Sequence, residues 1–390
     1  MTSSSVPQYS SQKASESAEA ATGVVGAQNS FGAQLLERLE SGNAVHQNLI
    51  ASPTSLWQAL ALAAGGAKGE TKTQMKNLLA VPSLSDEQIG AANRAFNTLL
   101  AEQRGASISV ANSVWFADTF RPNPAFSEMA SKNFAAGVET FAHDNLGEGA
   151  QKINGWVSEH TQKEIPQIVE ADDLRGQSAL LVNAVYFRGG WKTKFAPTTT
   201  APAPFHLADG TAVQVPMMHG TQESAYLDGQ SFEGARLPYE NTGCALWVML
   251  PKEGKTPTDV LKELGQESAR KLRGSDKVNL SLPRFDVQWR REVSRELAQM
   301  GAPLPFSDQA DFSGLGEPAT AISKVIHVCK MRVDEEGTVA AAATVVGMRT
   351  LSMRRDETKK LDFDRPFVVA LVEEMSGARL FEGTVYDPRS

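Results

Sequence analysis

Residues Gly337–Glu357 read GTVAAAATVVGMRTLSMRRDE, and the two halves of this stretch suit different environments. Its first half places four consecutive alanines between threonines and valines, which predicts a strand with small side chains. Its second half ends in polar and charged residues that a hydrophobic core excludes, because an unpaired buried charge is strongly unfavourable. The stretch therefore predicts a small-residue strand directly followed by an exposed tether, and the rest of the chain must explain why they are adjacent.

The whole chain has the composition of an ordinary soluble protein. Its 390 residues are 41% hydrophobic and 21% charged, which is enough to bury a large core. No Pro/Gly/Ser-rich linker divides Phe31 from Tyr386, so we expect a single domain over residues 31–390. Residues 1–30 are rich in Ser and Ala and poor in large apolar groups, and we expect them to form a flexible tail.

Charge and motifs exclude several classes of partner. The net charge of -7 argues against a general attraction to nucleic acid or to anionic membrane surfaces. The sequence has no secretory signal pattern and no apolar run of membrane-spanning length, so we expect a cytoplasmic monomer, with export by another route left open. The six histidines lack metal-ligand spacing, and we expect neither a metal site nor a cofactor.

The periodicity of apolar residues predicts helices early in the chain and strands later. Helical spacing covers residues 30–40, 53–66, 69–80 and 85–103, with Ser85 as a helix N-cap followed by two acidic residues. Residues 108–116, 178–187, 244–251, 278–287, 366–374 and 378–386 are β-branched or aromatic runs that predict strands. We expect a mixed fold of the α+β class with large sheets. Cys244 and Cys329 lie in such runs and are predicted to be buried free thiols.

Motifs of known enzymes are missing from the sequence. No G-x-S-x-G elbow, P-loop, G-x-G-x-x-G or H-E-x-x-H pattern occurs. A catalytic triad assembled only in space stays open as a hydrolase hypothesis, but no motif places its nucleophile. We therefore do not expect an enzyme.

Five further blocks occur in order along the chain. They are NLIASPTSLWQALALAAGGAKGETKTQM (48–75), LVNAVYFRGGWKTKF (181–195), LPRF (282–285), ISKVIHVCKMRVDEEGTVAAAAT (322–344) and DRPFVVALVEEMSGARLFEGTVYDP (364–388). Together these blocks resemble the serpins, a family of serine protease inhibitors. The resemblance implies the serpin fold, in which three β-sheets are surrounded by eight or nine helices. It also implies an exposed reactive-centre loop at about residues 336–361 that acts as bait for a protease.

This resemblance explains the opening stretch, since one segment then has two environments. It implies that the loop is exposed before cleavage and afterwards inserts as a strand into the largest sheet. The resemblance places the loop hinge at Glu335, Gly337, Thr338, Ala340, Ala341, Ala342, Ala343 and Thr344. From Thr338 on these residues are small or β-branched, and Thr338 is expected to be exposed or peripheral before cleavage. Val339 departs from the family, whose inhibitors often carry Glu there.

The resemblance also places the bond that the protease attacks. Counting 16 residues on from Glu335, as the family rule does, gives Leu351 followed by Ser352. A leucine predicts chymotrypsin-like or elastase-like targets. A shift of the bond within Arg349–Arg355 to an arginine would favour trypsin-like enzymes, and papain-like cysteine proteases also remain open.

Other matched positions are implied to control how the sheet opens. The family has a polar cluster under its central strands, an aromatic residue beside the loop hinge, and a basic residue that would pair with Glu335. The matching residues are Ser52, Ser55, Asn183 and His327 for the cluster, Trp191 for the aromatic position and Arg284 for the basic one.

One alternative remains within the family, namely a non-inhibitory carrier or chaperone with the same fold. Such relatives often have bulky, charged or proline-containing hinges. The hinge GTVAAAAT has none of these features, which favours the inhibitor.

Overall fold

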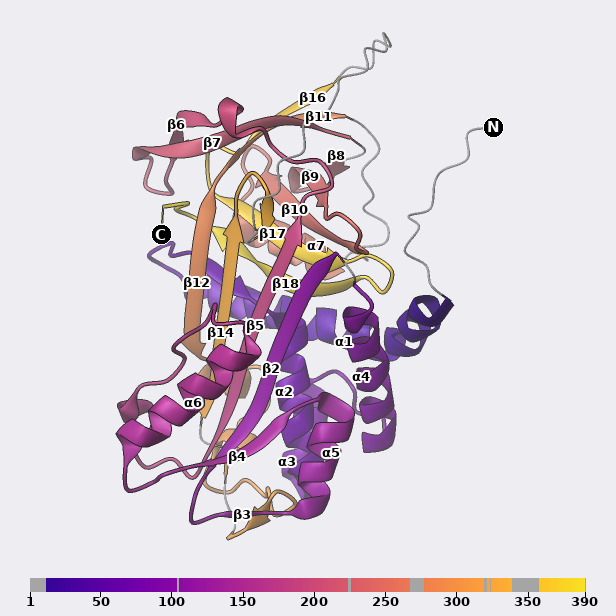
Figure 1. Cartoon of the computed structure of the whole chain (residues 1–390), viewed down its shortest axis with the longest axis vertical. Helices are drawn as coiled ribbons and strands as arrows, with labels where there is room; N and C mark the ends of the chain where they lie inside the picture. The colour runs from indigo at the N-terminus through magenta and orange to yellow at the C-terminus, as the bar shows by residue number, and fades with distance from the viewer. Residues whose placement is uncertain are drawn as a thin grey trace.

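The structure, a computed structural model, describes residues 12–103, 105–223, 226–266, 277–318, 321–322, 324–338 and 358–389 (Figure 1). Within these residues, helices dominate the first part of the chain and strands the rest, which confirms the predicted α+β class. The helices are α1 (Gln12–Ser41), α2 (Pro53–Gly66), α3 (Gly69–Leu78), α4 (Asp86–Ala101), α5 (Pro124–Phe134), α6 (Leu146–His160), α7 (Pro257–Gln266) and α8 (Ser294–Gln299).

Residues 1–30 were predicted to be a flexible tail, and helix α1 corrects this prediction for residues 12–30, because the helix begins at Gln12. The Ser- and Ala-rich composition of this segment does not indicate that its small apolar residues form one face of a helix. Ala18, Ala21 and Val25 are buried in one cluster with Phe96 and Leu99 of α4. Alanine has the highest helix propensity, and packing on a neighbouring helix supplies the burial that the isolated segment lacks.

Local sequence explains where two other helices begin. Ser85 caps α4 as predicted, since its side chain accepts from the Gln88 N–H while Gln88 accepts from the Ser85 N–H. Ser52 caps α2, and Pro53 occupies the first turn, where a missing N–H costs nothing. Nearly every residue of α2 is buried, because this helix lies inside the molecule and touches the main sheet, defined below.

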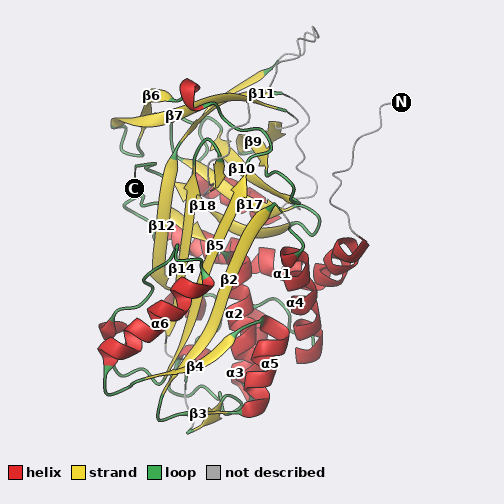
Figure 2. Ribbon diagram, in the orientation of Figure 1, coloured by secondary structure: helices red, strands yellow, loops and turns green. Residues whose placement is uncertain are grey.

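Three large sheets and one two-stranded sheet form the β part of the described chain (Figure 2). The main sheet runs β12 (Phe285–Glu292), β14 (Lys324–Val333), β15 (Gly337–Thr338), β5 (Ala179–Gly190), β2 (Ala106–Ala117) and β4 (Gly137–Phe141). The second sheet runs β1 (Leu49–Ala51), β18 (Ala378–Val385), β17 (Phe367–Glu373), β10 (Cys244–Pro251), β9 (Phe232–Pro238) and β8 (Tyr226–Asp228). The third sheet runs β16 (Lys359–Asp362), β11 (Val278–Pro283), β7 (Ala212–Gln222) and β6 (Ala201–His206), and β13 (Gly316–Glu317) pairs with β3 (Arg121–Pro122).

The main sheet is covered on both faces, which explains why β5 is apolar from Ala179 to Phe187 apart from Asn183. Leu180 and Val182 pack against α6, which crosses in front of the sheet in Figure 2. Leu181 and Val185 point to the opposite face and join the two larger core clusters. A strand that alternates between two buried faces carries apolar residues at every position. The described residues include no helix long and apolar enough to cross a membrane.

The segment after α6 is tied down across the main sheet by basic side chains of β12 and β14. Arg290 Nε donates to the Ile168 carbonyl at 2.7 Å, and Lys324 Nζ donates to the Asp173 carbonyl at 2.9 Å. Lys330 Nζ lies 3.3 Å from Glu164. These contacts hold α6 and its connection over the line where β14 meets β5.

Candidate functional site

Strand β15 consists of the first two residues of the stretch that opened the sequence analysis. It lies between β14 and β5, because Thr338 pairs with Val333 on one side and with Gly189 on the other. Below this point β14 and β5 pair directly with each other in parallel, from Lys324 and Leu180 to Lys330 and Tyr186. Gly337 and Thr338, two residues of the predicted hinge, therefore lie at one end of the main sheet between its two central strands.

A tight turn brings the chain from β14 into β15. The Asp334 carboxylate accepts hydrogen bonds from the N–H groups of Glu336 and Gly337, at 3.0 and 3.3 Å. The Asp334 N–H donates to the Gly337 carbonyl at 3.0 Å. A Cβ at Gly337 would lie 2.1 Å from the Gly189 carbonyl oxygen, so only glycine fits this position of the hinge.

Thr338 corrects an expectation, because it is neither exposed nor peripheral. Its side chain is 1% exposed, and its hydroxyl shares a hydrogen bond of 2.5 Å with the Tyr239 hydroxyl. Pairing with β5 turns the Thr338 side chain toward the core between the main and second sheets, where Tyr239 lies. The sequence analysis predicted a hinge here, but it did not indicate that Thr338 is buried in the sheet.

The predicted pairing of Arg284 with Glu335 is confirmed. Arg284 Nε donates to both carboxylate oxygens of Glu335, at 2.8 and 2.7 Å, and its Nη2 donates as well. Thr200 donates a further hydrogen bond to the same carboxylate, which is 4% exposed. Burial alone would raise the pKa of Glu335, but these hydrogen bonds outweigh it and hold the pKa below its ordinary value. Glu335 is therefore a buried, ionised anchor at the start of the hinge.

Trp191 lies beside the hinge, as expected from its matched position. Its Nε1 donates to the Asp334 carbonyl at 2.8 Å, and its backbone N–H donates to the Glu336 carbonyl at 2.9 Å. The indole stacks on Tyr239 with ring centroids 4.6 Å apart. Sequence analysis missed Tyr239 and also Lys194, whose Nζ lies 2.6 Å from Glu336. Lys194 was within a quoted family block, three residues after Trp191, but nothing in the sequence pointed to Tyr239.

The four predicted members of the polar cluster do meet beneath the central strands. The Ser52 N–H donates to His327 Nε2 at 3.0 Å, and the Ser55 N–H donates to the Ser52 hydroxyl at 3.3 Å. Asn183 Nδ2 donates to the Ser55 hydroxyl, and Asn183 lies directly opposite His327 in the sheet. All four are 0–1% exposed. The residues come from α2, its cap and both strands that border the hinge.

The structure extends this cluster through residues that sequence analysis missed. Asn183 Nδ2 also donates to Asn112 Oδ1, Asn112 donates to Gln58 Oε1 at 3.3 Å, and Gln58 donates to Asn97 at 3.0 Å. Sequence analysis could have found Gln58 and Asn112, because each is a polar residue within an otherwise apolar run. The Asn183 Oδ1 atom is buried and has no hydrogen-bond partner among the described residues.

His327 is held in its neutral form. Burial lowers its pKa to about 3, because desolvation penalises the charged imidazolium. Its Nε2 atom accepts the Ser52 N–H and so carries no proton. This histidine therefore acts as a hydrogen-bond acceptor near pH 7.

The remaining predicted positions lie outside the described residues. They are Ala340, Ala341, Ala342, Ala343, Thr344, Leu351 and Ser352, together with most of the expected loop at residues 336–361. The chain on either side is fixed in different sheets, with Thr338 in the main sheet and Lys359 at the start of β16 in the third sheet. The segment that carries the predicted bond must therefore connect these two sheets.

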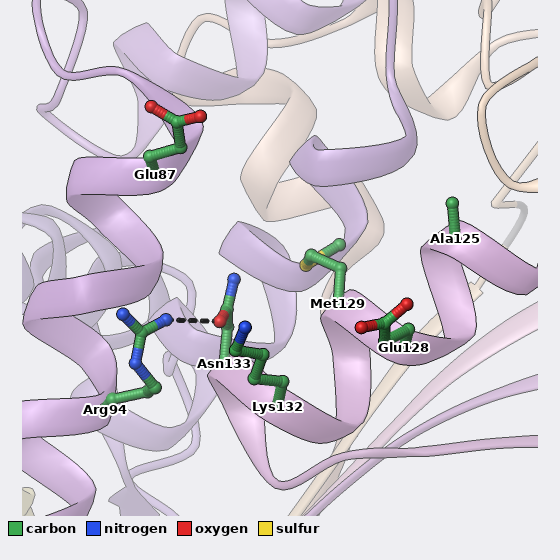
Figure 3. A pocket seen from close by; sticks show the side chains of 7 residues that line it. All are labelled: Glu87, Arg94, Ala125, Glu128, Met129, Lys132 and Asn133. Atoms are coloured by element: carbon green, nitrogen blue, oxygen red, sulfur yellow. Dashed lines mark hydrogen bonds between the residues drawn. The ribbon is translucent and has the colours of Figure 1, made fainter.

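Two other features of the described residues do not form a functional site. Asp118, His143 and Asp144 bring three metal-capable atoms within 4.8 Å of one another, but all are exposed, and the contact of 2.5 Å between His143 and Asp118 already explains their proximity. A pocket of about 330 Å³ lies between α4 and α5 (Figure 3). Its charged lining residues are two acids and two bases, Glu87, Glu128, Arg94 and Lys132, so it favours no class of ligand.

Comparison with known proteins agrees with this architecture. The sequence profile of the family described as Serpin (serine protease inhibitor) matches residues 26–388. Serpin-Z2A of Oryza sativa subsp. japonica is 32% identical over 421 residues, covering 94% of this chain and 98% of that protein. The native-state structure of tengpin, a thermophilic serpin, is similar with a TM-score of 0.84 at 26% identity, covering 93% of this chain and 94% of that one. Human thyroxine-binding globulin shares the fold with a TM-score of 0.82 at 23% identity, covering 95% and 100%.

The chain therefore belongs to the serpin family. Members of this family are generally protease inhibitors rather than enzymes, and a reactive loop and a metastable fold are typical of them.

Proposed function

We propose that this serpin is a suicide-substrate inhibitor of a chymotrypsin-like or elastase-like serine protease, cleaved between Leu351 and Ser352. The observation that supports this proposal most directly is the position of β15. Thr338 already pairs with both central strands of the main sheet and Gly337 pairs with β5, so a cleaved loop has a preformed starting point for insertion. Insertion would then extend an existing ladder instead of nucleating a new one.

The register of β15 predicts the partners of the inserted strand. If the antiparallel pairing continues, Thr344 lies opposite Asn183 on β5 and opposite His327 on β14. Directly opposite residues in a ladder point to the same face, so the Thr344 side chain would face the polar cluster. Its hydroxyl would supply a donor for Asn183 Oδ1, which has no partner among the described residues. The only threonine between Thr338 and Thr350 thus falls at the level of the polar pair Asn183 and His327.

Insertion requires β14 and β5 to separate along the whole of their direct pairing, from Lys330 and Tyr186 to Lys324 and Leu180. The alanines of the hinge favour this step, because small side chains enter a packed gap without overpacking it. The fourteen residues from Thr338 to Leu351 would form a strand of about 45 Å at roughly 3.3 Å per residue. An enzyme attached to Leu351 would therefore be carried the length of the main sheet.

The chemistry follows from cleavage at this bond. The protease's serine hydroxyl attacks the carbonyl carbon of Leu351, the bond to the Ser352 nitrogen breaks, and the new amino group leaves with a proton. The inhibitor stays attached to the protease as an ester. Insertion competes with hydrolysis of that ester, so this chain acts as a consumed substrate and not as an enzyme.

The principal alternative is a non-inhibitory carrier. Thyroxine-binding globulin has the same fold, but its likeness to this chain is below 25% identity and bears on the fold alone. The small, uncharged hinge residues support inhibition. A monomeric state and a cytoplasmic location remain predictions from the sequence, which size-exclusion chromatography and cell fractionation would test.

Incubation with chymotrypsin-like, elastase-like, trypsin-like and papain-like proteases, followed by denaturing electrophoresis, tests the proposal. We expect a denaturant-resistant 1:1 complex with a chymotrypsin-like or elastase-like enzyme and a released fragment that begins at Ser352. A fragment that begins at Thr350 or Arg355 would overturn the proposed bond. Digestion by every protease without a complex would favour the carrier.

A further inference from the structure

A second pocket, of about 350 Å³, is lined by none of the predicted hinge residues and lies where five segments converge. The end of α1 and the loop after it form one wall, and the loop before α7 forms another. The β6–β7 turn, the segment before β17 and the residue after β18 complete it. A volume of this size accommodates a small organic molecule.

The pocket walls offer flat apolar surfaces. Three prolines line it, Pro251, Pro257 and Pro366, together with the ring of Tyr386. His46 lies beside Tyr386 with ring centroids 5.0 Å apart. Proline rings have no rotamer freedom to lose, so a planar ligand that packs on them costs little side-chain entropy. These walls suit an aromatic ring better than a strongly hydrated ion.

The charges of the lining favour an anion. Lys255 and Arg365 are exposed at the pocket, and Glu40 is its single acidic residue. Arg365 is held in place, since its Nη2 donates to the Pro251 carbonyl at 3.1 Å and its Nη1 donates to Asp364 at 3.2 Å. Planar guanidinium groups and lysine ammonium groups both bind carboxylates well.

Glu40 does not balance these cations as a surface acid would. It is 6% exposed, and one of its oxygens accepts a hydrogen bond from the Tyr386 hydroxyl. Burial raises the pKa of Glu40 above its ordinary value, because desolvation penalises the carboxylate. The carboxyl group is thus directed into the protein, while Lys255 remains exposed at the pocket and Arg365 is exposed but already paired with Asp364.

We propose that this pocket binds a small aromatic carboxylate, with its ring between the prolines and Tyr386 and its carboxylate at Lys255 and Arg365. The pocket between α4 and α5 provides a contrast, because acids and bases balance there (Figure 3). The proposal concerns the intact protein in the absence of any protease. The proposed binding does not depend on the proposed inhibition and holds even if the protein inhibits no protease.

Calorimetric titration with three probes of the same shape tests the charge preference. We expect phenylacetate to bind, phenylacetamide to bind at least about fivefold more weakly, and 2-phenylethylamine to bind more weakly still. Equal or tighter binding of the amine would overturn the proposal, as would an absence of phenylacetate binding at millimolar concentrations.

Two lysine variants then locate the site. Lys255→Ala is expected to weaken phenylacetate binding about tenfold. Lys262→Ala is the matched control, since Lys262 is an α7 lysine that does not line the pocket and pairs with Glu37 at 3.3 Å. It should bind within about twofold of the wild type. An equal loss in both variants would indicate a general charge effect and overturn the assignment.

Glu40→Gln completes the test by removing the one acidic group of the lining. We expect unchanged or tighter phenylacetate binding, because the substitution removes a negative charge and keeps the shape. A variant that melts like the wild type but binds phenylacetate tenfold more weakly would show that the carboxyl group attracts the ligand, and would overturn the proposal.

Discussion

Replacing Arg284 by alanine is expected to destabilise the hinge at neutral pH and to leave it nearly unaffected in acid. The substitution removes the hydrogen bonds from Arg284 to Glu335 and leaves a buried carboxylate with Thr200 as its remaining side-chain donor. Breaking a fully buried ion pair costs about 3–5 kcal/mol. The Arg284 side chain is 43% exposed while that of Glu335 is 6% exposed, so solvent screening reduces the expected cost to about 2 kcal/mol.

This cost corresponds to a small but measurable shift in melting temperature. At about 2.1 cal/mol/K of unfolding entropy per residue, a domain of about 360 residues shifts by roughly 1.3 °C for each kcal/mol. We therefore expect Arg284→Ala to melt about 2–3 °C below the wild type at pH 7. Lys194→Ala serves as the control, because it breaks a more exposed pair with Glu336 and is expected to cost less than about 1 kcal/mol.

The pH dependence identifies the cause. The folded protein holds the pKa of Glu335 below its ordinary value, so the stabilisation is fully present above the unfolded pKa of about 4.3. It is lost as the pH falls through the lower folded pKa, where the carboxyl group becomes protonated and no longer needs a cation. The difference between wild type and Arg284→Ala should therefore shrink below about pH 4. A deficit that persists undiminished in acid, or none at pH 7, would refute the assignment of Glu335 as an ionised anchor.

Three further outcomes are expected. Cleavage within residues 347–355 by a nontarget protease should raise the melting temperature, because the freed strand completes the main sheet; an unchanged melting curve after verified cleavage would favour the carrier. Thr338→Arg should lower the melting temperature of the uncleaved protein and increase the number of inhibitor molecules consumed per protease inhibited, since Thr338 is already buried beside Tyr239. Thr338→Val loses about 1 kcal/mol through the missing hydrogen bond to Tyr239 and should keep the wild-type stoichiometry; a change as large as that of the arginine variant would argue against charge burial as the cause.

Sequence blocks located most of the hinge site because each block is local. The run from Ile322 to Thr344 contains the strand, the turn and the hinge in continuous order, and the structure reproduces that order from β14 to β15. Sequence analysis did not find the contacts between residues that are distant along the chain. Tyr239 meets Thr338 across 99 residues, and Asn112 meets Asn183 across 71, so only the packing of separate strands brings them together.

The amino-acid sequence by itself determined the family and the pairing of Arg284 with Glu335, since these depend on residue types at matched positions. Tertiary structure decided how deeply the hinge enters the sheet, because the register of β15 against Gly189 and Val333 turns Thr338 into the core. Packing likewise made residues 12–30 a helix, although their composition predicts a tail, because α4 supplies the apolar surface that a short alanine-rich segment cannot provide for itself.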